Sequence, residues 1–218
     1  VYENIAKIGV IASTPVDTQM GVDFVLNKGL KAVGHSTASN PEEQNLFQFL
    51  EPHVLTEKVL KIIRDLENRN IFRTMIYCNS LSAAIDTKYL RNSQPKSIVI
   101  TPLDIYKELA LKYKKITLWA ANGQCLSAIE HIFYEQNPTI DIMGVSMLPV
   151  IKAIEEKKSS EYIISQFDII SLSIKKFNPD SLILGCTHLP YLQPELSKAL
   201  NTPIVDPAEE MLRLLTVQ

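Results

Sequence analysis

A short apolar run that ends in a cysteine occurs twice in the chain, at a constant spacing. Cys186 lies 108 residues after Cys78, and Ile116, at the head of another strand-like run, lies the same distance after Ile8. The order strand, turn, helix, strand, cysteine therefore occurs twice. This repetition predicts an internal duplication, in which two α/β units each place one cysteine at the end of a strand.

Short apolar runs alternate with amphipathic stretches along the whole chain, which is typical of parallel α/β architecture. The segments 56–69 and 162–177 predict helices, whereas 35–52 is polar and loop-like. We expect strands at 8–12, 73–77, 97–100, 115–121, 140–145, 181–184 and 203–205.

The predicted fold class is α/β, with two pseudo-symmetric α/β lobes, mostly parallel sheets, and an active site in the cleft between the lobes. The first lobe is predicted to comprise residues 1–96 plus 205–218, and the second residues 97–204. Because no Gly/Ser-rich linker interrupts the chain, the two lobes are expected to pack closely.

Composition argues against several classes of protein. A formal charge of −2 and a pI near 6.1 argue against binding to nucleic acid or to an anionic membrane. No apolar run reaches the ~18–20 residues of a membrane-spanning helix, and the first residues lack the pattern of a signal peptide. Three cysteines, spaced by 47 and 61 residues, fit neither a fully paired disulfide framework nor a zinc motif. Free thiols in a reducing cytoplasm are therefore expected. Cys125, which lies in no motif, is expected to be an ordinary core or surface residue.

Cysteines at strand ends suit one particular chemistry. In open α/β sheets, ligands bind at the carboxyl ends of the strands. A thiolate there can remove the proton from a carbon stereocentre while a thiol on the opposite face delivers another, so Cys78 and Cys186 together could invert the carbon. The adjacent Asn79, Ser80 and Thr187 can donate hydrogen bonds to a substrate carboxylate.

The segments Cys78-Asn79-Ser80 and Gly185-Cys186-Thr187-His188-Leu189-Pro190 resemble the two signature motifs of the aspartate/glutamate racemase family. This resemblance implies a small acidic amino acid as substrate and racemisation without a cofactor or a metal. It makes Cys78 and Cys186 the catalytic acid and base. The substrate-binding residues expected from the motifs and their surroundings are Ser13, Thr14, Asn79, Ser80, Gln124, Thr187 and His188.

The chain departs from the family pattern near its first strand. Ala12-Ser13-Thr14 stands where glutamate racemases carry Asp-Ser-Gly, so the aspartate that assists the thiol is missing. The following Pro15-Val16-Asp17-Thr18 is closer to the P-x-A-T of the aspartate branch. Segment 36–41 resembles a loop of the glutamate branch, but Glu42-Glu43 replaces the Tyr-Gly that follows it. His188 favours glutamate, and the motifs leave glutamate and aspartate both open.

Three other functions remain open on sequence alone. A hydrolase with one nucleophilic cysteine and His188 as its base would account for that cysteine and the histidine, but it leaves the second cysteine without a role. A degenerate family member that only binds an acidic ligand fits the missing aspartate at Ala12. A related carbon-acid isomerase, such as a maleate isomerase, is the third. We expect no nucleic-acid or membrane partner, and a homodimer is compatible with the sequence.

Overall fold

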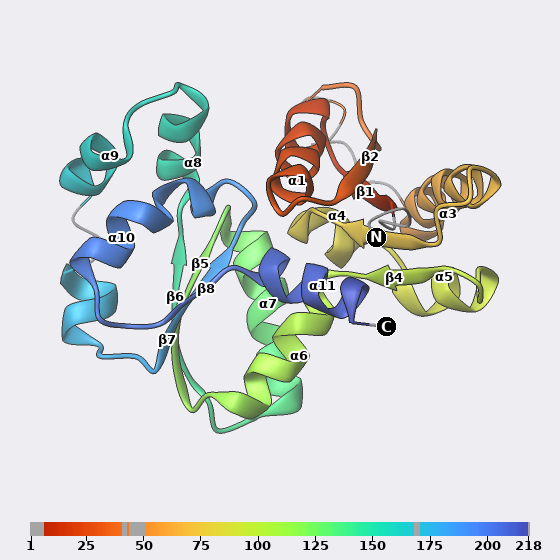
Figure 1. Cartoon of the computed structure of the whole chain (residues 1–218). Helices are drawn as coiled ribbons and strands as arrows, with labels where there is room; N and C mark the ends of the chain where they lie inside the picture. The colour runs from red at the N-terminus through yellow and green to blue at the C-terminus, as the bar shows by residue number, and fades with distance from the viewer. Residues whose placement is uncertain (1–6, 41–42, 44–50, 168–170, 218) are drawn as a thin grey trace. The chain divides into compact units, whose positions relative to one another are not determined.

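The computed structural model describes residues 7–40, 43, 51–167 and 171–217. It contains two four-stranded parallel sheets, each flanked by helices (Figure 1). The chain divides into two compact units, Val1–Pro102 with Glu210–Gln218, and Leu103–Glu209. The predicted α/β class with two parallel sheets is confirmed.

The first unit is built on a sheet with the strand order β2-β1-β3-β4. Its elements are β1 (Lys7–Ala12), α1 (Pro15–Asn27), β2 (Lys31–Ser36), α3 (Pro52–Asn68), β3 (Arg73–Ile76), α4 (Asn79–Ala84), α5 (Thr87–Ser93), β4 (Ile98–Ile100) and the C-terminal α11 (Pro207–Thr216).

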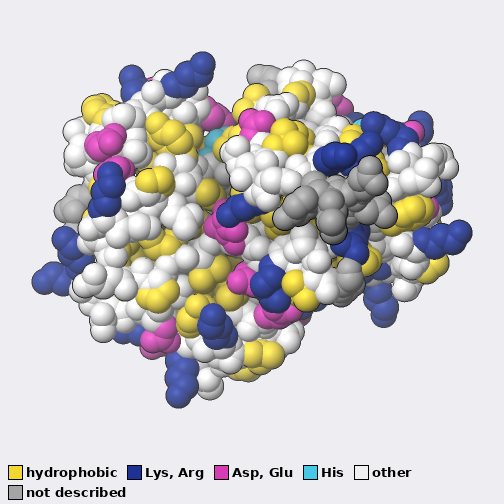
Figure 2. All heavy atoms as spheres, viewed as in Figure 1, with side chains coloured by type: hydrophobic (Ala, Val, Ile, Leu, Met, Phe, Trp, Pro, Cys, Tyr) yellow, Lys and Arg dark blue, Asp and Glu magenta, His cyan; other side chains and the backbone are white. Residues whose placement is uncertain are grey.

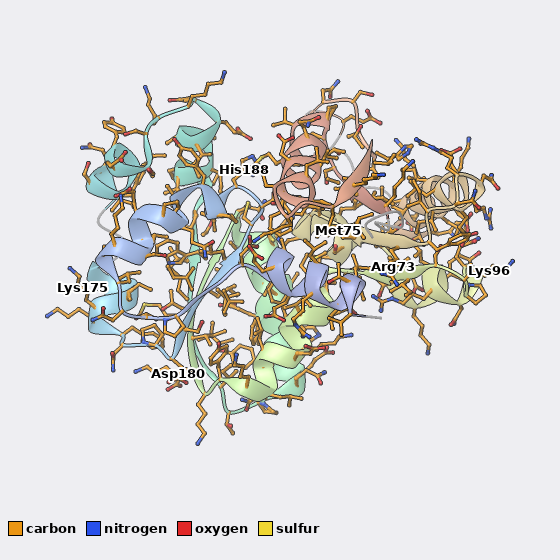
Figure 3. All side chains as sticks on the ribbon, in the orientation of Figure 1. Arg73, Met75, Lys96, Lys175, Asp180 and His188 are labelled. Carbon is orange, nitrogen blue, oxygen red and sulfur yellow. The ribbon has the colours of Figure 1, made fainter. Side chains whose placement is uncertain are left out.

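Helices cover both faces of the first sheet. A Cβ added at Gly9 would meet Leu66 of α3, whereas Val10 lies against Gly21 of α1. Because successive residues of a strand point to opposite faces, α3 and α1 lie on opposite sides of β1. α11 is tied to the same sheet, since the Arg73 guanidinium on β3 (Figure 3) donates to the Leu215 carbonyl at 2.9 Å.

The second unit is built on a sheet with the equivalent strand order, β6-β5-β7-β8. Its elements are α6 (Pro102–Lys112), β5 (Lys115–Ala120), α7 (Gly123–Gln136), β6 (Asp141–Ser146), α8 (Leu148–Glu155), α9 (Ser160–Gln166), a π-helix η2 (Ser171–Lys176), β7 (Ser181–Gly185), a 3-10 helix η3 (Leu189–Leu192), α10 (Gln193–Ala199) and β8 (Ile204–Val205).

Two apolar layers hold the second unit together. On one face of the sheet, α8, α9 and α10 cover a core around Trp119, Leu182 and Leu184 that also contains the thiol of Cys186 (Figure 1). On the other face lie α6 and α7, whose Tyr106 and Phe133 rings are 5.7 Å apart. The second thiol is therefore fixed by a packed core.

The register of the strands repeats with the spacing that the sequence predicts. Ile8 of β1 pairs with Arg73 of β3, and Ile116 of β5 pairs with Ser181 of β7. Each partner of the second pair lies 108 residues after its counterpart in the first. The N-cap side chains of α1 and α7, Thr14 and Asn122, are separated by the same interval and each accepts a backbone N–H three residues on. The two units thus share one local design.

The structure corrects several boundaries. β2 occupies Lys31–Ser36, where no strand was predicted, because its mostly half-exposed residues show no strong apolar pattern. The predicted helix at 162–177 is replaced by α9 and η2, with 168–170 outside the described residues. β4 pairs with β3 in the first sheet, although it was assigned to the second lobe. Val205 pairs with Ile183 in the second sheet, although it was assigned to the first.

Figure 2 shows lysine and arginine side chains dispersed over the drawn face, with aspartate and glutamate among them. Within the described ranges, no helix is both long and apolar enough to cross a membrane.

Candidate active site

Cys78 lies where β3 gives way to α4. The ladder of the sheet extends one residue past β3, since the Tyr77 N–H donates to the Ile11 carbonyl at 2.7 Å. Cys78 then adopts an extended conformation as the N-cap of α4, and its carbonyl accepts the Ser82 N–H and the Ser82 hydroxyl. The thiol is 5% exposed. Strand and helix together fix it at the carboxyl edge of the sheet.

Two hydroxyl groups contact the Cys78 thiol. Ser13 Oγ lies 3.0 Å and Ser80 Oγ 3.3 Å from Cys78 Sγ, both within hydrogen-bond distance. Ser13 follows β1 and is itself fixed, because its carbonyl accepts the Ala38 N–H at 2.7 Å. The structure therefore brings together Cys78 and Ser80 from one motif and Ser13 from a distant segment of the sequence.

The electrostatic surroundings of Cys78 favour the protonated thiol. Burial raises the pKa of Cys78 above its ordinary value, and the negative charge of Asp17 raises this pKa further. Hydrogen bonds from Ser13, Ser80 and the Leu81 N–H act in the opposite direction. Asp17 lies in the first turn of α1 and is 6% exposed. The sequence analysis did not identify Asp17 as a site residue.

Cys186 directly follows β7 and is 8% exposed. The preceding Gly185 permits a close approach of backbone segments, because a Cβ there would lie 2.8 Å from the Trp119 carbonyl oxygen. Cys186 Sγ lies 3.7 Å from His188 Nδ1. His188, labelled beyond the end of β7 in Figure 3, has its Nε2 3.4 Å from Glu155 Oε1.

These contacts form a chain of proton-binding groups from Cys186 through His188 to Glu155. The His188 side chain is 11% exposed, whereas that of Glu155, at the end of α8, is 57% exposed. The Glu155 carboxylate orients the His188 ring through Nε2, so that Nδ1 of the same ring faces the Cys186 thiol. Sequence reasoning missed Glu155, because it lies on a separate helix with no motif around it.

Further titratable groups surround this second thiol. Cys125 Sγ is 3.9 Å from the Gly185 carbonyl oxygen, next to Cys186. Burial raises the pKa of Tyr106 well above its ordinary value, and negative charge at Cys125, Asp206 and Cys186 acts in the same direction. Tyr106 therefore stays a neutral phenol. Sequence reasoning gave it no role, since its pattern is only that of a core helix.

The remaining predicted site residues lie at the starts of helices or directly beside a cysteine in the sequence. Thr14 caps α1, with its hydroxyl accepting the Asp17 N–H at 3.2 Å. Asn79 is buried in the first turn of α4, and Thr187 is half-buried beside Cys186. Gln124 is exposed in the first turn of α7. In the described part of the chain, no group of three potential metal ligands occurs.

Each half-site can bind or release a proton at a fixed point. Around Cys78 the neighbours are hydroxyls and one carboxylate, and around Cys186 they are an imidazole with its carboxylate. Each thiol stands at the carboxyl end of the third strand of its sheet, the edge at which α/β proteins bind ligands. A thiol with such neighbours is suited to proton transfer at carbon.

The chain is similar to racemases in sequence and in fold. No family model matches the chain. Glutamate racemase of Limosilactobacillus reuteri (strain DSM 20016) is 26% identical over 175 residues, which are 73% of this chain and 61% of that protein. The chain thus spans about three fifths of this relative.

The solved structures that share the fold include two racemases. Glutamate racemase of Francisella tularensis in complex with D-glutamate has a TM-score of 0.66 at 18% identity, covering 97% of this chain and 79% of the other. Allantoin racemase of Klebsiella pneumoniae has a TM-score of 0.64 at 14% identity, covering 96% and 86%. The chain therefore shares the fold of these two racemases. The relative and these structures confirm the resemblance to the aspartate/glutamate racemase family that the two cysteine motifs predicted.

Proposed function

We propose that this protein is a cofactor-independent racemase of acidic amino acids, in which Cys78 and Cys186 act on opposite faces of the substrate α-carbon. One thiolate removes the α-proton, and the other thiol delivers a proton to the opposite face. The observation that carries the proposal is the duplicated placement of a buried thiol after the third strand of each sheet, each thiol with a polar partner two residues on.

The residues around the thiols have distinct tasks in this mechanism. Ser13 and Ser80 hold the Cys78 thiol by hydrogen bonds, and His188 exchanges a proton with Cys186. Asn79 and Thr187, each next to a thiol in sequence, are proposed to donate to substrate carboxylate oxygens. These donors matter because the α-carbon becomes acidic only when the negative charge that develops on the carboxylate is stabilised.

Glutamate is the proposed preferred substrate, with aspartate as the second candidate. The relative found by sequence is named glutamate racemase, and one structure with this fold contains D-glutamate. His188 points to the same branch of the family. The Asp-Ser-Gly turn is missing, because Ala12 stands in place of its aspartate. Ser13 remains in contact with the Cys78 thiol, so we propose that this thiol is assisted by different groups from those in glutamate racemases.

A carbon-acid isomerase such as a maleate isomerase is the second candidate. This chain shares its fold with allantoin racemase, and allantoin is not an amino acid. The shared fold therefore supports the proposal of carbon-acid chemistry on a substrate other than an amino acid. A family member that only binds an acidic ligand would have the same fold with no turnover. Neither alternative predicts exchange of the α-proton of an amino acid with solvent.

The test is isotope exchange in heavy water with each enantiomer of glutamate and aspartate, followed by chiral chromatography and mass spectrometry. The wild-type protein should both invert and label the α-carbon. Cys78→Ser and Cys186→Ser should each abolish inversion, because a serine hydroxyl is too weak an acid at neutral pH. Each variant should still label the one enantiomer whose proton faces its remaining thiolate.

Cys125→Ser is the matched control, since it removes a third buried thiol that has no place in the mechanism, and it should racemise like the wild type. If either single variant at Cys78 or Cys186 still inverted glutamate near the wild-type rate, the two-thiol mechanism would be wrong. If the wild-type protein neither inverted nor labelled any acidic amino acid, the proposed activity itself would be wrong.

A further inference from the structure

We propose that Thr37 is a positioning residue of the first half-site, whose hydroxyl holds the turn after β1 so that Ser13 keeps its own hydroxyl on the Cys78 thiol. This inference rests on the proposed two-thiol function and deepens it. It assigns the task to a residue that lies outside both cysteine motifs, directly after β2, and that acts on the thiol through Ser13.

The Thr37 side chain is 1% exposed and faces two consecutive carbonyl groups of the turn. Its hydroxyl lies 3.2 Å from the Ala12 carbonyl oxygen and 3.5 Å from that of Ser13. Backbone bonds reach the same acceptors, since the Thr37 N–H donates to Ala12 at 2.9 Å and the Ala38 N–H donates to Ser13 at 2.7 Å. These carbonyls belong to the peptide units on either side of the Ser13 Cα, so three donors fix the backbone from which the Ser13 side chain projects.

The Ser13 hydroxyl is the group that this backbone carries to the thiol. Ser13 is 1% exposed, and its Oγ lies 3.0 Å from Cys78 Sγ. A serine side chain has one rotatable bond between Cα and Oγ, so the position of the hydroxyl is set by the backbone and by a single rotamer. Because hydrogen bonds weaken steeply as their angle is lost, a small shift of the turn would weaken the contact with the thiol.

The second unit contains the same turn without the hydroxyl. Met147 follows β6 as Thr37 follows β2. Each donates its N–H to the last residue of the neighbouring central strand, Thr37 to Ala12 at 2.9 Å and Met147 to Ala120 at 2.8 Å. Since methionine has no hydroxyl, the backbone bond is enough to close this turn.

The repeat also shows where the extra hydroxyl is used. The residue 108 positions after Ser13 is Ala121, whose methyl group cannot hydrogen-bond a thiol. The hydroxyls of Thr37 and Ser13 therefore occur together in one half of the protein, and both are replaced in the other. This joint occurrence indicates that the Thr37 hydroxyl serves the placement of Ser13.

The hydroxyl can be removed without leaving a buried carbonyl unpaired. The carbonyls of Ala12 and Ser13 each keep a backbone N–H as donor in a Thr37→Val variant. The large penalty for a buried acceptor without a partner is thereby avoided. Valine also keeps the branched shape of the side chain, so this variant is expected to fold and to change mainly the placement of the turn.

The experiment measures the reactivity of Cys78 and needs no turnover. The intact protein is alkylated with iodoacetamide at a fixed pH, and each cysteine is followed by peptide mass spectrometry, with Cys186 of the same sample as the reference. The hydrogen bond from Ser13 lowers the pKa of Cys78 and so favours the thiolate, which is the form that reacts. Ser13→Ala and Thr37→Val should each slow the alkylation of Cys78 several-fold relative to Cys186.

A double-mutant cycle tests whether Thr37 acts through Ser13. In a Ser13→Ala background, Thr37→Val should have no further effect, because the hydroxyl that it positions is gone. Slowing by the same factor in both backgrounds would refute the inference, and so would a wild-type rate in Ser13→Ala. Thr37→Ser keeps the hydroxyl and should react like the wild type; a rate as low as that of Thr37→Val would also refute the inference.

Thr56 provides the matched control in the same unit. Its side chain is equally buried, at 1% exposed, and its hydroxyl donates to the Pro52 carbonyl within α3 at 2.7 Å. Thr56→Val removes a comparable bond and should leave the rate at Cys78 unchanged. Equal slowing in Thr56→Val and Thr37→Val would indicate a general loosening of the unit and refute the role of Thr37, as would a wild-type rate in Thr37→Val.

The racemase assay adds a kinetic readout. Thr37→Val should lower kcat several-fold for both enantiomers and change KM less, because Thr37 positions a partner of the thiol and does not bind substrate. A slowed Cys78 in a protein that neither inverts nor labels acidic amino acids would refute the racemase function alone. Racemisation in a protein whose Cys78 reactivity is the same in Thr37→Val would refute the role of Thr37 alone.

Discussion

The cap at Thr14 allows a structural role and a substrate-binding role to be separated by substitution. Thr14→Ala removes the hydroxyl that accepts the Asp17 N–H at 3.2 Å, and this site is 6% exposed, so water can replace the bond only in part. Loss of a threonine N-cap costs about 1 kcal/mol, within a range of about 0.5–2 kcal/mol. That is roughly a fivefold change in the unfolding equilibrium, or about 2–4 °C in Tm for a chain of this size.

Thr14→Asn restores the cap, because asparagine is among the preferred N-cap residues. The repeat supplies a matched case in Asn122→Ala, which removes the acceptor of the Cys125 N–H at 2.9 Å from the second unit. Urea titration followed by circular dichroism should show similar losses for both alanine variants and near wild-type stability for Thr14→Asn. Wild-type stability for Thr14→Ala, or an equal loss for Thr14→Asn, would refute the capping argument. Lost racemase activity in a fully stable Thr14→Asn would assign Thr14 to the substrate.

Three further outcomes are expected. Gly21→Ala should cost about 1–3 kcal/mol, because the new Cβ would lie 2.7 Å from Tyr77 Cγ, whereas Gly123→Ala, with nothing within 4 Å, should not destabilise; urea titration checks both. The raised pKa of Cys78 makes the folded state hold a proton that the unfolded state releases, so the free energy of unfolding should fall as pH rises above the ordinary thiol range of about 8.5, and Cys78→Ser should remove this component. His188→Glu should change the ratio of kcat/KM for glutamate and aspartate, and an unchanged ratio would remove His188 from specificity.

The sequence alone was sufficient to predict the strands and helices that have strong apolar patterns. β5 and β7 are buried along nearly their whole length, so their apolar runs stand out, and α3 has one clear apolar face. The edge strand β2 was missed because its exposed and half-exposed positions carry a mixed set of residues. Its partner β1 supplies the hydrogen bonds that make it a strand, and such pairing is not visible in a local pattern.

The residues of the candidate site also divide into those that the sequence predicts and those that it does not. Cys78, Ser80, Cys186 and His188 could be found because each pair lies within one motif. Ser13 was expected from the family resemblance, and the structure gives it a contact with Cys78. Side chains that arrive from other elements leave no such signal in the sequence.

Glu155 and Asp17 show why the partners of a thiol are harder to predict than the thiol itself. Glu155 reaches His188 from the last residue of α8, and Asp17 acts from the first turn of α1. Each depends on how a helix is set against the end of a strand, which is decided by packing over the sheet. The 108-residue repeat does carry a usable signal for Asp17, because it pairs this residue with Cys125 under matching caps. A buried acid at a position where the other half carries a thiol is a difference between equivalent backbones. Such differences are the positions at which two copies of one fold can diverge in chemistry.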